Sequence, residues 1–145
     1  MTFSGEAADA TLTLPHALRQ RSRQRVRLDN GGDARLYLAQ GTVLRHGDRL
    51  VSTDGLIVEV RAAAETVSTV RCGRARDQAQ VCYHLGNRHV DIQIGEGWVR
   101  YLHDHVLDDM MSRQGYEVIV EQRPFEPLTG AYAAMGRGER DDSAS

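Results

Sequence analysis

The sequence predicts an α+β fold, with a small all-β domain at the N-terminus and a ferredoxin-like βαββαβ domain at the C-terminus. In the first half, short apolar runs alternate with turn residues, a pattern typical of a small barrel or sandwich. In the second half, two stretches of helical periodicity lie between strand-like runs, in the order strand, helix, strand, strand, helix, strand. The pattern changes at 62–65, so we expect domains at residues 1–65 and 66–134.

A hairpin is the clearest element of the first domain. Two strand-like runs, 25–28 and 35–38, flank the sequence DNGGD at 29–33, whose Asn and Gly residues adopt positive φ at little cost. Two more short strands are expected at 50–51 and 56–58, each bounded by Gly and Asp. This domain is a candidate for binding a partner or a peptide.

The second domain begins with a strand at 67–72 and a helix at 76–85. In this helix, Ala79, Cys82 and Tyr83 stand at i, i+3 and i+4 and form its apolar face. We expect the sequence Gly86-Asn87 to end the helix in a positive-φ conformation.

The remaining elements are two strands at 90–94 and 98–102, a helix at 106–114 and a strand at 116–121. Asp104 is a suitable N-cap for this second helix, because its short carboxylate side chain can accept hydrogen bonds from the first free backbone amides of the helix. Gly115 is expected to end it.

Composition limits the classes of function. Hydrophobic residues make up 41% of the 145 residues, enough for a modest core. A formal net charge of -2 gives no general attraction to nucleic acid or to an anionic membrane. Neither a secretion signal nor an apolar run of membrane-spanning length is present, so we expect a cytoplasmic protein. Residues 135–145 are mostly Gly, Arg, Glu, Asp and Ser and are expected to form a disordered tail.

Four of the six histidines lie between His84 and His105, and imidazole is the commonest protein ligand of borderline metals. His89 follows a helix stop and precedes a strand. His103 and His105 are separated by one residue, so their rings point to the same side if the segment is extended and diverge at a helix start. Both interpretations stay open, and His84 is expected to be a packed or hydrogen-bonded residue.

The two cysteines, Cys72 and Cys82, are expected to be buried, reduced thiols. They do not have the CxxC spacing of a metal site, and a soft metal would need the strand and the helix to bring them together.

Four stretches resemble the urease accessory metallochaperone family, UreE. They are YHLGNRH at 83–89, YLHDHVLDDM at 101–110, PFEPLTGAY at 124–132 and RLDNGGDARLYLAQGTVLRHGDRL at 27–50. The resemblance implies a cytoplasmic, non-enzymatic homodimer that binds nickel and delivers it to the urease apoprotein through a complex with a nickel-handling GTPase. It also implies that the C-terminal domain dimerises, that His89 of both chains shares the metal, and that His103 and His105 match peripheral metal positions.

One departure from the family concerns the C-terminus. Many of its members carry a His-rich tail, whereas residues 136–145 contain no His, so storage of many metal ions by a tail is not expected. Nitrogen ligands also bind copper and zinc, and the choice of nickel as cargo is therefore implied by the resemblance alone.

Two other classes compete with a metallochaperone. A metal-dependent hydrolase needs a carboxylate base beside an open metal position, and Asp91 and Asp104 are the candidates for that base close in sequence to the histidines. An RNA-binding module can share the βαββαβ order but displays aromatic residues on its central strands, and the strand 67–72 contains none.

Five arginines alternate with other residues before the hairpin turn: Arg19, Arg21, Arg23, Arg25 and Arg27. In an extended stretch all five guanidinium groups would lie on one face. They would either protect a sheet edge from pairing with another chain or dock an acidic partner, such as the GTPase or urease.

Overall fold

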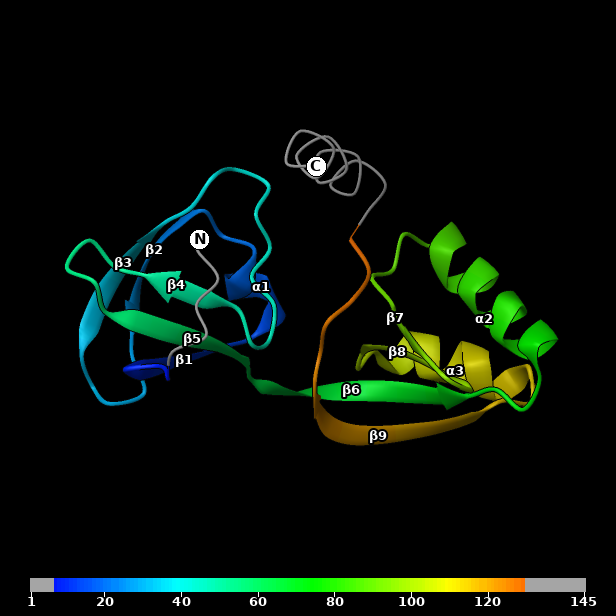
Figure 1. Cartoon of the computed structure of the whole chain (residues 1–145). Coiled ribbons are helices and arrows are strands. Elements are labelled where there is room, and N and C mark those ends of the chain that lie inside the picture. The colour runs from blue at the N-terminus through cyan, green and yellow to red at the C-terminus, as the bar shows by residue number, and fades with distance from the viewer. Residues whose placement is uncertain (1–6, 130–145) are drawn as a thin grey trace. The chain divides into compact units, whose positions relative to one another are not determined.

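The computed structural model describes residues 7–129, and the chain divides between Ala63 and Ala64 into two compact units. The tail expected at 135–145 lies outside the described residues. The first unit is rich in strands and the second has the order β-α-β-β-α-β, which confirms the predicted α+β fold class (Figure 1). Within the described residues, no helix is long and apolar enough to cross a membrane.

The first unit combines a three-stranded sheet with a two-stranded ribbon. Its elements are β1 (Ala10–Leu14), α1 (His16–Arg19), β2 (Arg23–Arg27), β3 (Asp33–Tyr37), β4 (Arg49–Val51) and β5 (Ile57–Ala62). The sheet has the order β1-β5-β4, with β1 parallel to β5, and β2 and β3 form the predicted antiparallel hairpin. Leu12, Val60 and Leu44 are fully buried in its core, so alternate residues of β1 and β5 fill the interior.

The prediction that five arginines share one face was wrong. Arg19 ends the short helix α1 and is completely buried. Its Nε donates to the Leu14 carbonyl at 3.1 Å and its Nη1 to the Leu44 carbonyl at 3.0 Å. These bonds compensate for burying a guanidinium group. Only Arg23, Arg25 and Arg27, in β2, lie on one exposed face.

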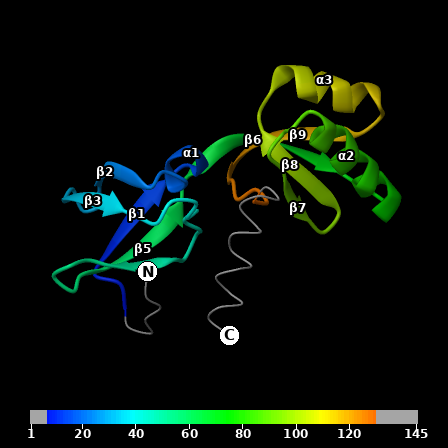
Figure 2. The same cartoon turned by 90° about the horizontal axis from the view of Figure 1, so that it is seen from above.

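The second unit is an antiparallel sheet with both helices packed on one face. Its elements are β6 (Ala64–Arg71), α2 (Ala75–Asn87), β7 (Gln93–Gly95), β8 (Trp98–Leu102), α3 (His105–Arg113) and β9 (Glu117–Pro124). The strand order is β7-β8-β6-β9, the arrangement of a ferredoxin-like fold (Figures 1 and 2). A common core of strand and helix residues includes Val70, Val99, Val81, Leu85 and Met111.

The apolar face predicted for the helix at 76–85, now α2, matches its buried face only at Cys82, which packs against the core. Val81 and Leu85 are fully buried, whereas Ala79 is exposed and Tyr83 is 65% exposed. The larger aliphatic pair buries more apolar surface than Ala79 would. Gln78 also belongs to the inner face, where its amide donates to the carbonyls of β7 and β8, and this polar residue obscures the pattern.

Candidate metal site

His89 lies at the C-terminus of α2 in a conformation that favours glycine. Its backbone amide donates to the Gly86 carbonyl at 3.0 Å, and the Val90 amide donates to the Leu85 carbonyl at 3.1 Å. These two bonds form a Schellman motif, which requires a left-handed residue at the position of His89. His89 accordingly has φ 57, the only positive φ among the non-glycine residues of the described chain.

The prediction that Gly86-Asn87 adopts positive φ was therefore wrong, because both residues are still inside α2. The end of the helix is set by packing: Leu85 is buried and Val90 packs against the same core, so the turn between them falls on His89.

Helix α3 ends in the same way and shows what the position at His89 ordinarily contains. There Gly115, with φ 91, donates to the Ser112 carbonyl at 3.0 Å, and Tyr116 donates to the Met111 carbonyl at 3.1 Å. A histidine at the equivalent position of α2 costs about 1 kcal/mol of backbone strain. Strain retained at an exposed imidazole, fixed by backbone bonds, is typical of a functional residue.

His103 follows β8 and is oriented by a chain of hydrogen-bonding groups. Its Nδ1 is 3.0 Å from an Asp108 oxygen and 3.1 Å from the Ser68 hydroxyl. The other Asp108 oxygen accepts from the Tyr101 hydroxyl at 2.7 Å. Burial and the Asp108 carboxylate raise the pKa of Tyr101 far above its ordinary range, so the phenol keeps its proton and donates. With the His103 proton on Nδ1, the Nε2 lone pair remains for a metal, the arrangement that orients many histidine ligands.

His105 is the first residue of α3, so the two histidines flank a helix start. Its Nε2 lies 3.7 Å from an Asp109 oxygen, whereas His103 pairs with Asp108, and the two rings therefore engage different carboxylates. Asp104 between them is the predicted N-cap: its Oδ1 accepts from the Val106 amide at 2.9 Å and from the Leu107 amide at 3.1 Å.

The ends of the two helices that carry these histidines are neighbours. Arg88, beside His89, lines a shallow hollow of ≈ 380 Å³ together with Val106, Asp109 and other side chains of α3. Val106 is 63% exposed although it is apolar. In residues 7–129 no group of three or more His, Cys, Asp or Glu side chains could hold a metal ion within one chain.

The other candidate ligands are in ordinary structural environments. His84 is half-buried, and its ring meets the Tyr83 ring edge-on with centroids 5.5 Å apart. Cys72 and Cys82 are free, and burial raises the pKa of both thiols, which disfavours the thiolate that binds metal.

Tyr101, Asp108 and Ser68 are the members of the site that the sequence did not indicate. Asp108 stands five residues after His103, and this spacing could have suggested it once α3 was known to begin at His105. Ser68 lies on β6, far away in the sequence, and no local pattern connects it to His103.

Comparison with known proteins places both units in one family. The N-terminal domain of the UreE urease accessory protein matches residues 4–63, and its C-terminal domain matches residues 65–144. The urease accessory protein UreE of Alkalilimnicola ehrlichii is 58% identical over 125 residues, which are 86% of this chain and 77% of that protein. The one of Citrobacter koseri is 50% identical over 139 residues, 95% of this chain and 91% of that protein. The chain therefore belongs to the UreE family of urease accessory proteins.

Proposed function

We propose that this protein is a nickel metallochaperone, which binds nickel as cargo and delivers it to the urease apoprotein during urease maturation, and is not itself an enzyme. Membership of the UreE family supports a role in urease maturation. The observation that carries the choice of site is His89: an exposed imidazole on a strained, rigid helix end, in a described chain that offers no complete metal site of its own.

A homodimer formed through the second unit would complete the site. A two-fold interface places equivalent residues opposite each other, so one histidine per chain supplies two ligands. Such a site leaves coordination positions open, and cargo can then be exchanged, unlike in a closed four-ligand cage. The apolar Val106 and the hollow beside Arg88 lie close enough to His89 in the fold to belong to that interface.

His103 and His105 would supply further ligands or a transfer step. His103 is the better ordered of the two, because Asp108 and Ser68 hold one ring nitrogen and leave the other free. His105 is 86% exposed and touches only one carboxylate, at 3.7 Å. Metal delivery would involve the nickel-handling GTPase and the urease apoprotein in the cytoplasm. Copper and zinc should also bind in vitro, since imidazole suits them as well.

The competing hydrolase has less support. Asp104 accepts two backbone amides as a helix cap, so its carboxylate is already engaged and is a poor general base.

The proposal is tested by calorimetric titration of nickel into the wild-type protein and the His89→Asn and His89→Gly variants, with light scattering to follow the dimer. Asn and Gly both tolerate positive φ, so these variants remove the imidazole and keep the turn. We expect the tightest event, at about half a metal per chain, to disappear in both and to persist in the control His84→Gln. Unchanged tight binding in the two His89 variants would remove His89 from the site.

A further inference from the structure

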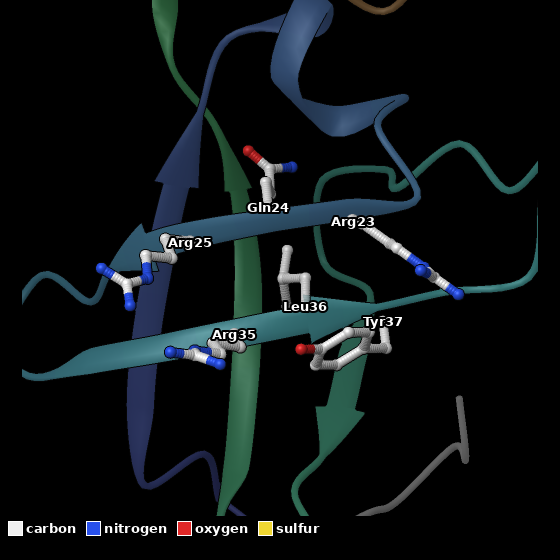
Figure 3. A pocket seen from close by; sticks show the side chains of 6 residues that line it. All are labelled: Arg23, Gln24, Arg25, Arg35, Leu36 and Tyr37. Carbon is white, nitrogen blue, oxygen red and sulfur yellow. The ribbon is translucent and has the colours of Figure 1, made fainter.

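The outer face of the β2–β3 ribbon carries a cluster of arginines that the nickel site does not use. Arg23 and Arg25 alternate along β2, and Arg25 lies directly opposite Arg35 on β3. Arg23 lies opposite Tyr37, with its guanidinium 5.9 Å from the ring centre. Figure 3 shows Arg25 and Arg35 side by side on neighbouring strands, with Arg23 and Tyr37 together farther along. We call these four residues the ribbon face.

The positive charge of the ribbon face is not neutralised within the described chain. Arg27, next along β2, pairs with Asp33 at 3.7 Å. Arg23, Arg25 and Arg35 form no ion pair with any residue in 7–129. Like charges directly opposite each other on antiparallel strands are destabilising, so the Arg25–Arg35 pair weakens the hairpin that carries it. A feature that opposes folding in this way needs a reason outside the fold.

The shape of the ribbon face suits an extended chain. Arg23, Arg25, Arg35 and Tyr37, with Gln24 and Leu36, line a shallow hollow of ≈ 400 Å³. Alternate residues of a strand lie about 6.8 Å apart, and an extended peptide with carboxylates at alternate positions has the same repeat. Arg23 and Arg25 could then each hold a carboxylate through two parallel hydrogen bonds, with Arg35 directly opposite Arg25 to bind the second carboxylate from the other side. Tyr37, 67% exposed, offers a flat apolar surface beside them.

We propose that the ribbon face docks an extended acidic segment of a protein partner, with Asp or Glu at alternate positions. This surface is a second binding site, independent of the nickel histidines. A nucleic acid is the weaker match, because polyanion binding grows with the number of phosphates neutralised, and the ribbon face offers three guanidinium groups on a chain of net charge -2. Protection of a sheet edge is the other role that exposed arginines commonly have.

The test measures the binding of a fluorescent peptide of alternating Glu and Ser, by anisotropy at low and high salt. The variant is Arg25→Gln/Arg35→Gln. The matched control, Arg27→Gln/Arg61→Gln, removes the same charge from arginines of the same unit that are already ion-paired, Arg27 to Asp33 and Arg61 to Glu59. We expect the first variant to bind the peptide about tenfold more weakly and the control to bind it as the wild type does. Both should bind nickel normally, which separates this proposal from the previous one.

Three results would overturn the proposal. Equal losses in the variant and the control would mean that only net charge matters. Full peptide binding by the variant together with self-association in light scattering would assign the arginines to edge protection. Tighter binding of polyuridylate than of the peptide would assign the surface to nucleic acid. Removing a repulsive pair should leave the melting temperature of the variant unchanged or raised, so loss of folding will not obscure these outcomes.

Discussion

At the scale of single residues, the candidate ligand and the strained backbone coincide at His89. Helices α2 and α3 end in the same hydrogen-bonded motif. The left-handed position is Gly115 at the end of α3 and His89 at the end of α2, so only α2 places a side chain there. Backbone bonds and the packing of Leu85 and Val90 fix the backbone of His89 on both sides, so the imidazole projects from a rigid point. A ligand on a rigid backbone loses less entropy when it binds a metal than one on a mobile loop.

The strain at His89 predicts a difference between two variants that both lack the imidazole. His89→Ala should be less stable than His89→Gly by about 1 kcal/mol, because alanine meets the left-handed penalty and glycine does not. The measurement is the free energy of unfolding in urea for both variants. Equal stabilities would show that the turn relaxes out of the left-handed region.

The hydrogen-bonded chain behind His103 predicts a role for Asp108 in metal binding. In a His89→Gly background, Asp108→Asn should weaken the remaining nickel binding by about tenfold or more, the effect usual for the partner that orients a histidine ligand. Asp109→Asn is the matched control, because Asp109 pairs with the more exposed His105 at a longer distance. Calorimetric titration makes the comparison, and equal affinities in the two variants would contradict an orienting role for Asp108.

The sequence indicated the three candidate histidines, but it did not indicate their backbone conformations or their hydrogen-bond partners. The positive φ was expected at Gly86-Asn87, where intrinsic preference favours it, and the packing of Leu85 against the core moved it to His89. The Asp108 contact depends on where α3 begins and on how α3 lies against β8, and the five-residue spacing from His103 does not give either of these.

Among the helices and strands, those whose signals are local in the sequence were predicted, and those that depend on contacts far along the chain were not. The β2–β3 hairpin was predicted because its turn chemistry lies in the sequence between the strands. Strand β1 was missed: it pairs in parallel with β5, with Ala10 beside Val58, so its partner is far along the chain. The short helix α1 was also missed, since its stability depends on the buried bonds of Arg19.

Hydrogen bonds of Asp29 connect the hairpin turn to β1, and they lead us to expect that stability depends on pH. Its carboxylate accepts from the Thr11 hydroxyl at 2.6 Å and the Thr13 hydroxyl at 2.7 Å. These hydrogen bonds lower the pKa of Asp29 below its ordinary value of 3.8. A lowered pKa in the folded state means that this contribution to stability is present above the ordinary value and is lost as the pH falls through the folded-state pKa.

We therefore expect Asp29→Asn to lower the free energy of unfolding by about 1 kcal/mol at pH 7, a modest value because the group is exposed. The difference from the wild type should shrink as the pH falls below 3.8. Urea unfolding over a pH series makes the measurement, with Asp33→Asn, an exposed acid on the same hairpin, as the control. If the difference in the free energy of unfolding did not change with pH, the charge on Asp29 would make no contribution to stability.

At the scale of the whole molecule, the order of elements was enough to predict the fold class, because βαββαβ with helical periods at the right places leaves few other topologies. The burial of the five alternating arginines could not be predicted in this way. The same alternating pattern supplies a buried residue at Arg19 and exposed ones from Arg23 onward, since Arg19 belongs to α1 and the strand begins only at Arg23. The burial of Arg19 depends on the nearby Leu14 carbonyl and on the carbonyl of Leu44, which lies far along the chain.

Whether two chains share one nickel ion between their His89 side chains can be seen by diffraction at the nickel absorption edge from crystals of the protein grown with nickel. We predict one strong anomalous peak on a two-fold axis, about 2.1 Å from a His89 nitrogen of each chain. Separate peaks, each bound within a single chain and with the two His89 rings far apart, would show that the chains do not share the ion.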